Sequence, residues 1–288
     1  MAARRLPPGD DVGALVVSLE STVTHAGYVG EYAPVLSTPA KLGAVGFTAA
    51  GAELGVDQAV AEVLGACRQL AMPGWTPPVV VVVPAVARQA RRDLLGALLE
   101  GPELSTATVC TDAALACVAH SRGTGLALHV GVEGTTAVPV VDCRAVVRLA
   151  QWAPAGGDFI ASRGVASWLD PGDEAAASHR FPGGAHLCAQ AALAAPENLQ
   201  PQLWGSVVAF GAGMAEAETS TKLAGALAQL HHGQLVEPMT RSRGPRARRL
   251  AAWLGGSVVG TAGTFSSCFV GKADLEEEGT RRVMAKLL

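Results

Sequence analysis

Residues 13–28 of the chain read GALVVSLESTVTHAGY. An apolar run from Gly13 to Ser18 leads into a turn, Leu19 to Thr22, that carries small hydroxyl residues, and a second run continues through Tyr28. Two extended runs joined by a short turn predict a β-hairpin with hydroxyl side chains at its tip. The prediction of the fold rests on this hairpin, because its pattern occurs a second time.

The second copy of the pattern lies at residues 126–141, which read LALHVGVEGTTAVPVV. Leu126 to Val130 predicts a strand, Val132 to Thr135 a turn, and Thr136 to Val141 a returning strand. One such hairpin in each half of the chain indicates a duplicated architecture.

Strands and helices alternate along the rest of the chain. The run Val79 to Val83 shows no alternation of polar and apolar residues, which predicts a strand covered on both faces. Asp57 can cap a helix that runs to about Leu70. Residues 170–196 show no pattern that predicts an element. Further helices are expected at 87–99, 112–120, 217–230 and 274–287, and a further strand at 206–210.

Composition narrows the class of protein. The 288 residues are 49% apolar and 16% charged, which is typical of a chain with a packed core. A net charge of −3 does not indicate general binding to nucleic acids or membrane surfaces. The six cysteines form no C-x-x-C pair, so we expect buried, reduced thiols and no metal site. Neither a membrane span nor a leader peptide is expected, since no apolar run approaches the required length and Asp10 and Asp11 precede the first one.

Four sequence blocks, in the same order along the chain, resemble actins and actin-related proteins. They correspond to the opening of that family, its second phosphate hairpin, the strand and loop that meet the adenine, and the C-terminal signature. The matching residues are, in that order, 13–16 with 26–31 and Pro34; 122–126 with 135–139; 203–208 with Gly211; and 253–257 with 263–265. The resemblance to the actin superfamily spans nearly the whole chain.

Three further stretches resemble one branch of the superfamily, the nuclear actin-related protein 4 type. They are residues 11–16, residues 155–160, and the ending 270–272 followed by Glu276, Glu277 and Gly279.

The resemblance implies an α/β, actin-like fold, which is ribonuclease H-like and duplicated, with two sheet-plus-helix halves around a cleft. It implies a flexible tail at 1–10, a first half at 11–122, a truncated second half at 123–249, and a segment 250–288 that returns to the first half. The chain is short for the family between Pro39 and Asp57 and between Asp158 and Trp204. We therefore expect the small subdomains to be reduced or missing, unless a longer transcript restores them.

In actins, two hairpins hold the phosphates of ATP with backbone N–H groups and hydroxyls, and an Asp from each hairpin positions Mg²⁺. By resemblance, Ser18 and His129 stand at these two Asp positions, and Glu20 stands where a Gly lets the phosphate approach. A carboxylate at about 4 Å from a phosphate costs roughly 1 kcal/mol in water and several times more in a cleft.

Other positions of the implied cleft also differ from the family. Asp112 and Thr136 stand where a Gln and a His orient the attacking water, Val132 where many members have another Asp, and His25 where a Lys is usual. We therefore expect no enzyme activity, no catalytic residue and no cofactor, although backbone N–H groups leave weak ATP binding open. The implied vestigial cleft comprises Ser18, Glu20, Ser21, Thr22, His129, Gly131, Thr135, Gly211 and Gly213.

The branch resemblance implies a non-catalytic subunit of a nuclear chromatin-remodelling or histone-acetylating complex. Such proteins pair with actin on a long helix of a larger subunit, which a groove between the two halves would receive. The side chains expected to contact this helix are Trp253, Phe265, Phe269 and Val270, and ordinary core packing is the alternative interpretation. The arginine-rich stretch 241–249 can be a DNA contact or, more simply, a solvated loop.

Two other functions stay open. A cytoskeletal or ciliary actin-like structural protein would be found in the cytoplasm instead of the nucleus. A nucleotide-binding actin-like protein would bind Mg-ATP tightly and turn it over.

Overall fold

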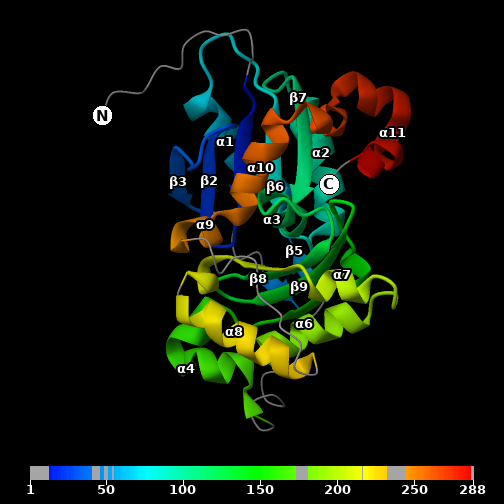
Figure 1. Ribbon diagram of the computed structural model, residues 1–288. Helices are drawn as coiled ribbons and strands as arrows, with labels where there is room; N and C mark the ends of the chain where they lie inside the picture. The colour runs from blue at the N-terminus through cyan, green and yellow to red at the C-terminus, as the bar shows by residue number, and fades with distance from the viewer. Residues whose placement is uncertain are drawn as a thin grey trace.

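Figure 1 shows a computed structural model of the chain, in which two lobes lie one above the other. The structure describes residues 13–40, 46–48, 51–53, 55–172, 181–215, 217–231 and 244–286. The tail predicted at residues 1–10 and the first three residues of the arginine-rich stretch, 241–243, lie outside these ranges.

The upper lobe is built on a six-stranded sheet with the order β13-β7-β6-β1-β2-β3. The three central strands run parallel, and the hairpin partner of β1 and the strands at both edges run antiparallel to their neighbours. The strands are β1 (Leu15–Leu19), β2 (Val23–Tyr28), β3 (Leu36–Pro39), β6 (Val79–Val83), β7 (Thr106–Thr111) and β13 (Val270–Gly271). The first predicted hairpin is therefore β1 and β2, at the centre of this sheet.

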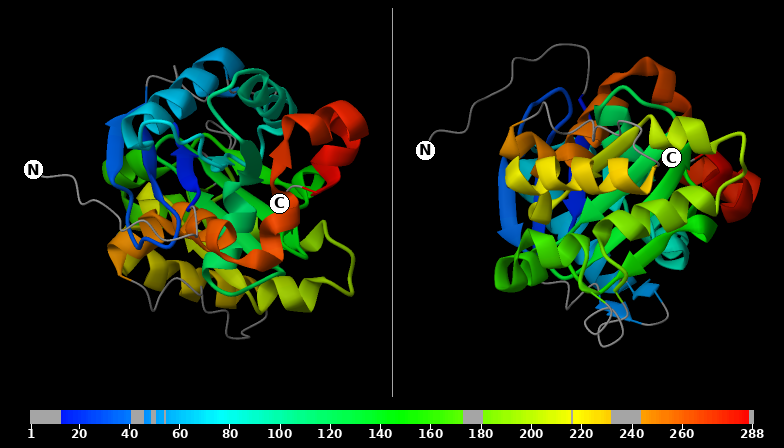
Figure 2. Two further views of the ribbon diagram at one scale, coloured as in Figure 1. Left: turned by 90° about the horizontal axis from the view of Figure 1, so that it is seen from above. Right: turned by 60° about the horizontal axis from the view of Figure 1, so that its bottom comes forward.

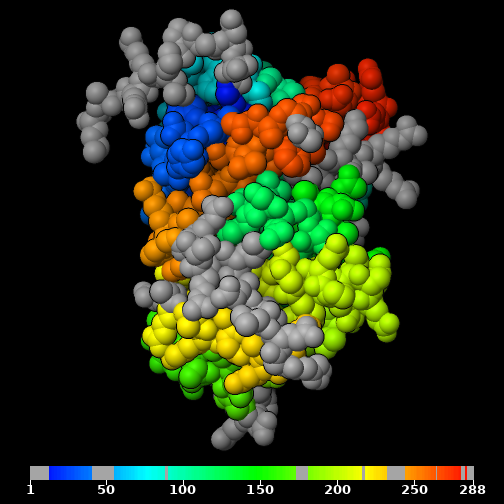
Figure 3. Space-filling view, viewed as in Figure 1, coloured from blue at the N-terminus to red at the C-terminus, as the bar shows by residue number. Residues whose placement is uncertain are grey.

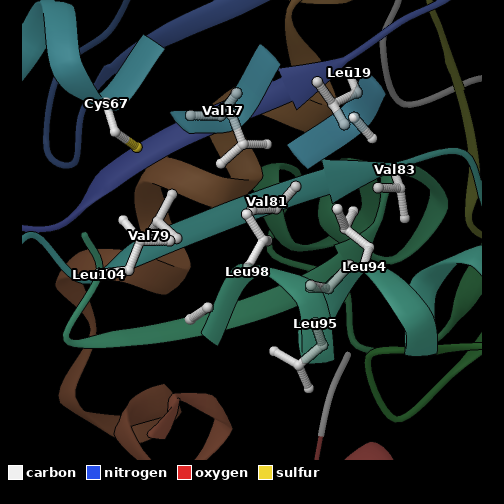
Figure 4. Close-up of a cluster of buried hydrophobic side chains, with 14 of the residues drawn as sticks. Val17, Leu19, Cys67, Val79, Val81, Val83, Leu94, Leu95, Leu98 and Leu104 are labelled. Atoms are coloured by element: carbon white, nitrogen blue, oxygen red, sulfur yellow. The ribbon is translucent and has the colours of Figure 1, made fainter. Parts of the chain in front are cut away.

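Alternate residues of the central strands bury opposite faces of the upper sheet. Val79, Val81 and Val83 pack with Leu94, Leu95 and Leu98 of α2 (Arg88–Glu100), and Figure 4 shows these side chains filling the space between strand and helix. Helix α1 (Val56–Leu70) covers the same face. Val80 and Val82 belong to the hydrophobic cluster on the other face. The five-valine strand is therefore covered on both sides, as its lack of alternation predicts.

The lower lobe repeats, as β10-β9-β8-β12, the order of the four upper strands β3-β2-β1-β6. Its central strand β8 runs antiparallel to β9 on one side and parallel to β12 on the other. Strand β9 in turn pairs antiparallel with β10 and with β11. The strands are β8 (Gly125–Val130), β9 (Thr135–Val141), β10 (Arg144–Ala145), β11 (Gln151–Ala153) and β12 (Val207–Phe210). The shared order confirms the predicted duplicated α/β architecture.

Helices cover the outer face of the lower sheet. Figure 2 (right) shows α6 and α8 lying across this sheet, with α4 beside them. Their inward side chains form one cluster with Leu126, Leu128 and Val130 of β8. The helices are α4 (Gly157–Leu169), α6 (Gly184–Leu193), α7 (Gln200–Trp204) and α8 (Ala217–Leu230).

A layer of two helices lies between the sheets and belongs to both lobes. Helix α3 (Asp112–Ala119) and helix α10 (Ala251–Thr261) share a cluster with Val16 and Val80 of the upper sheet and with Val208 of the lower sheet. In Figure 3 the atoms around α3 (green) are visible below α10 (orange) and above the helices of the lower lobe (yellow). The core is therefore continuous through the interface of the two lobes.

Several elements differ from the sequence-based expectation. Helix α1 begins at Val56 after an N-cap at Gly55, and its first-turn Asp57 does not cap it. Residues 46–48 and 51–53 form a small hairpin of β4 and β5 in a stretch expected to be only a connection. Helices α4 and α6 lie where no element was predicted. The C-terminal helix α11 (Lys272–Lys286) begins two residues earlier than expected and packs on α2.

Candidate functional site

The tips of the two hairpins meet at one small cavity between the lobes. It lies at the carboxyl ends of β1, β6, β8 and β12, the edge of a parallel arrangement where ligand sites commonly occur. The lining residues are Ser18, Leu19, Glu20, Ser21, Pro84, Asp112, His129, Gly131, Glu133, Phe210, Gly211, Arg249 and Ala252. The cavity volume is about 30 Å³, enough for one or two water molecules.

Most of the predicted cleft residues lie together at this cavity, and three lie elsewhere. Thr22 is exposed on the turn of the first hairpin. Thr135 is fully buried, where its hydroxyl donates to the carbonyl of Ala155 at 2.5 Å and accepts from the indole N–H of Trp168 at 3.1 Å. Gly213 packs against Val130. Thr135 therefore serves packing of the lower lobe and does not face the cavity.

Asp112 and His129 form an ion pair across the cavity. Nδ1 of the imidazole lies 3.1 Å from Oδ2 of the carboxylate. The other carboxylate oxygen, Oδ1, accepts the backbone N–H groups of Ala85 at 2.8 Å and Ala113 at 2.7 Å. Burial by itself would lower the pKa of His129. The hydrogen bond to Asp112, the charge of Asp112 and the charge of Glu20 together outweigh burial, so the pKa of His129 is raised. The imidazole ring also stacks on Phe210, with ring centroids 4.9 Å apart.

A second acid–base group lies at the tip of the first hairpin. Burial raises the pKa of Glu20 to about 7, although the charges of His129 and Arg249 oppose the shift. Glu20 Oε1 lies 3.8 Å from Nε2 of His25, whose pKa is lowered to about 4 by burial and then by the charge of Arg249. The other imidazole nitrogen of His25 is 2.8 Å from the Ser37 hydroxyl. Glu20 and His25 therefore keep their neutral forms over an unusually wide pH range.

Arg248 and Arg249 reach the cavity region from α9 (Pro245–Arg249). Arg249 lines the cavity, and the buried Arg248 guanidinium donates to the carbonyls of Met214 at 2.7 Å and Ala215 at 2.8 Å. These carbonyls belong to the loop that follows β12. From the sequence, both arginines were predicted only as members of a basic stretch, and nothing in their spacing distinguished them from solvated neighbours.

The loop after β12 requires a glycine at its first position. Gly211 has φ +105°, and a Cβ there would overlap the carbonyl oxygen of Val130 and the imidazole of His129. A residue with a side chain would be strained in this backbone conformation and would also displace His129. Gly211 therefore allows the end of β8 to approach the loop after β12 closely.

The side chains expected to contact a partner helix divide into two groups. Trp253 and Val270 are each only 1% exposed and pack in the core, so they offer no contact area to a partner. Phe265 and Phe269 are partly exposed. Phe269 lines a groove of about 270 Å³ with the end of α10, Ala14, Pro78 and Thr106. This groove lies at the amino ends of the upper strands and not, as expected, between the two lobes.

Metal clusters, disulfides and membrane-spanning helices are absent from the parts of the chain that the structure describes. Across them, no three His, Cys, Asp or Glu side chains gather in a way that could hold a metal ion. Their cysteines form no disulfide, and no helix among them has the length and apolar character needed to span a membrane.

The fold and the cavity define a class of protein: two α/β lobes of the same strand order, each with its hairpin tip at a central cleft. The family model for actin matches residues 168–287, which include α6, α7 and α8 of the lower lobe, β12, α10 and α11. Over this part the chain is similar to actin, and its fold is actin-like.

Proposed function

We propose that this chain is a non-catalytic actin-related protein that serves as a structural subunit of a nuclear chromatin-remodelling or histone-acetylating complex. The observation that carries the proposed loss of catalysis is the filled cleft, whose side chains leave a cavity of about 30 Å³. Ligand pockets in proteins are usually about 300–1,000 Å³. A nucleoside triphosphate would have to separate Asp112 from His129 to enter.

The charges at the cleft do not fit a magnesium-bound triphosphate. The Glu20 and Glu133 carboxylates line the space that phosphates would occupy, and their negative charge opposes phosphate binding when ionised. Mg²⁺ prefers free carboxylate oxygens and ordered water. Both oxygens of Asp112 are already engaged by backbone N–H groups and by His129.

The nuclear part of the proposal rests on the resemblance of three stretches to one branch of the superfamily. They are residues 11–16, residues 155–160, and residues 270–272 with Glu276, Glu277 and Gly279. In such a complex the chain would pair with actin along a long helix of a larger subunit. An uncharged groove beside Phe269 and a half-exposed Val258 on α10 are surfaces suited to the apolar face of a helix.

Titration of the purified chain with Mg-ATP tests the loss of catalysis. We expect no saturable binding up to about 1 mM nucleotide, since the cavity is too small and carries carboxylates. Isothermal calorimetry measures the binding, and release of inorganic phosphate measures turnover. Monomeric actin, measured alongside, shows that the assay detects binding. Tight Mg-ATP binding with turnover by this chain would overturn the proposal and favour a nucleotide-binding enzyme.

Substitution of one groove residue tests the partner surface. Phe269→Asp is expected to reduce the actin and complex subunits recovered with the tagged full chain about tenfold, because a charge in an apolar groove is not solvated by the partner. Leu193→Asp is the matched control, since Leu193 is 65% exposed on α6 of the other lobe. Equal recovery with both variants, when both melt like the unsubstituted chain, contradicts this surface.

Localisation separates the nuclear proposal from the cytoskeletal one. A fluorescently tagged chain is expected in the nucleus, where it should co-purify with chromatin-complex subunits. Exclusion from the nucleus would contradict the proposal and favour a cytoskeletal or ciliary structural protein.

A further inference from the structure

The charged residues of the cleft come from both lobes and are paired with one another. Asp112 follows directly after β7 of the upper sheet, whereas His129 belongs to β8 of the lower sheet. Their side chains are 12% and 19% exposed, with 3.1 Å between the nearest carboxylate oxygen and Nδ1. Water and salt therefore screen the attraction much less than at the surface.

Each member of the pair is fixed within its own lobe. Two backbone N–H groups, of Ala85 and Ala113, hold the Asp112 carboxylate. The Phe210 ring lies nearly parallel to the His129 imidazole, at an interplanar angle of 13°. Because neither side chain must be ordered to make the contact, forming the pair costs little side-chain entropy.

We propose that Asp112 and His129 form an ionic clasp that keeps the two lobes closed on each other without any small molecule between them, and that the clasp loosens when His129 loses its proton. The other charged groups that line the same cavity are Glu20, Glu133 and Arg249, and His25 lies beyond Glu20. The clasp does not depend on the presence of a partner complex.

The direction of the pH effect follows from the raised pKa of His129. A histidine whose pKa is higher in the folded chain than in the unfolded chain contributes stability that is fully present below the unfolded value, about 6.5. This contribution to stability is lost as the pH rises through the pKa that His129 has in the folded chain. Burial opposes the charged imidazole, whereas Asp112 and, when ionised, Glu20 both favour it. The clasp is therefore closed in mild acid and weakened in alkali.

Hydrogen–deuterium exchange of the intact chain tests the clasp. Peptides covering residues 18–24 and 129–136 report on the two hairpin tips. Asp112→Asn keeps a side-chain oxygen for Ala85 and Ala113 but removes the charge, and His129→Gln removes the imidazole. Each variant is expected to increase exchange of these peptides about tenfold at about pH 6, and the double variant to increase it no further.

The controls separate the clasp from a general loss of stability. Arg68→Gln removes an exposed ion pair with Glu103 on the outer face of the upper lobe and is expected to leave the hairpin peptides unchanged. In a chain carrying Glu20→Gln, which removes the separate titration of Glu20, exchange corrected for its intrinsic pH dependence is expected to rise as the pH is raised above about 6.5. The same chain with Asp112→Asn added should show no such rise.

Two results would overturn the clasp. One is unchanged exchange at the hairpin tips in Asp112→Asn, and the other is additive effects of the two single substitutions. If His129→Gln does not fold, Asp112→Asn and the pH series still decide the question. Because no nucleotide or partner is added, the clasp can fail while the proposed structural role stands, and the reverse also holds.

Discussion

Addition of one methyl group at Gly255 is expected to lower the free energy of unfolding by about 3 kcal/mol or more. A Cβ at this position would overlap the backbone carbonyl of Leu115 in α3, which cannot move aside as a flexible side chain can. Gly255→Ala must therefore push α10 away from α3 and open the layer between the sheets. Chemical denaturation of the purified chain measures the change.

Gly65→Ala is the matched control for this prediction. Gly65 lies inside α1, where nothing lies within 4 Å of the added methyl group. Alanine is the better helix former, so this variant is expected to be more stable by about 0.5–1 kcal/mol. If both substitutions shift the denaturation midpoint in the same direction and by the same amount, close approach of the two helices does not limit stability.

Glu20→Gln is expected to stabilise the chain in alkali by about 2–3 kcal/mol and to have no effect in strong acid. The pKa of Glu20 is raised from 4.5 to about 7, mainly by burial. A raised pKa means that stability is present below 4.5 and is lost as the pH rises through about 7, where the folded chain must hold a partly buried carboxylate. Glutamine keeps the shape and never ionises.

The test is a series of denaturation midpoints between about pH 4 and about pH 9. His25, whose pKa is lowered to about 4, loses its own contribution as the pH falls from 6.5 to 4 and should do so in both proteins. The Glu276→Gln variant changes an exposed carboxylate on α11 and controls for net charge. Parallel curves for Glu20→Gln and the unsubstituted chain would show that Glu20 ionises freely in the folded state.

The hairpins and the valine strand could be predicted from sequence because their signals are local. Residues 13–28 and 126–141 each contain two extended runs and a turn, and the structure places them at the centres of the two sheets. Helix α8 was also predicted with its observed bounds, since leucines at helical spacing mark one face. A local sequence pattern is enough to predict an element whose formation does not depend on its neighbours in the fold.

Helices α4 and α6 were missed for identifiable physical reasons. Helix α6 follows Gly183 with no side-chain cap, and its buried face consists mainly of Gly, Ala and Cys. Because the large apolar Leu193 is exposed, the contrast between the two faces is weak. Helix α4 contains a kink at Gly164, where φ is +83°. Neither segment shows the capping residue and the strong apolar stripe on which sequence prediction depends.

The cleft was predicted residue by residue but not as an arrangement. The family resemblance singled out Asp112 and His129 separately, as two losses from a catalytic site. Their contact depends on how α3 sits between the sheets, which no local pattern encodes. Arg249 and Phe210 were missed for the same reason. A sequence can thus indicate which side chains lie at a cleft more readily than which of them pair.

The helical layer between the sheets also constrains the order in which the chain can fold. Gly30 of the first hairpin donates its backbone N–H to the Ser257 hydroxyl on α10, a residue 227 positions later. Helix α3 covers part of the inner face of the upper sheet, but the part that packs on α10 stays uncovered during synthesis until α10 has left the ribosome. Contacts of such long range form slowly, and exposed strands awaiting them are prone to aggregate. We infer that the nascent chain depends on chaperones until its last segment is available.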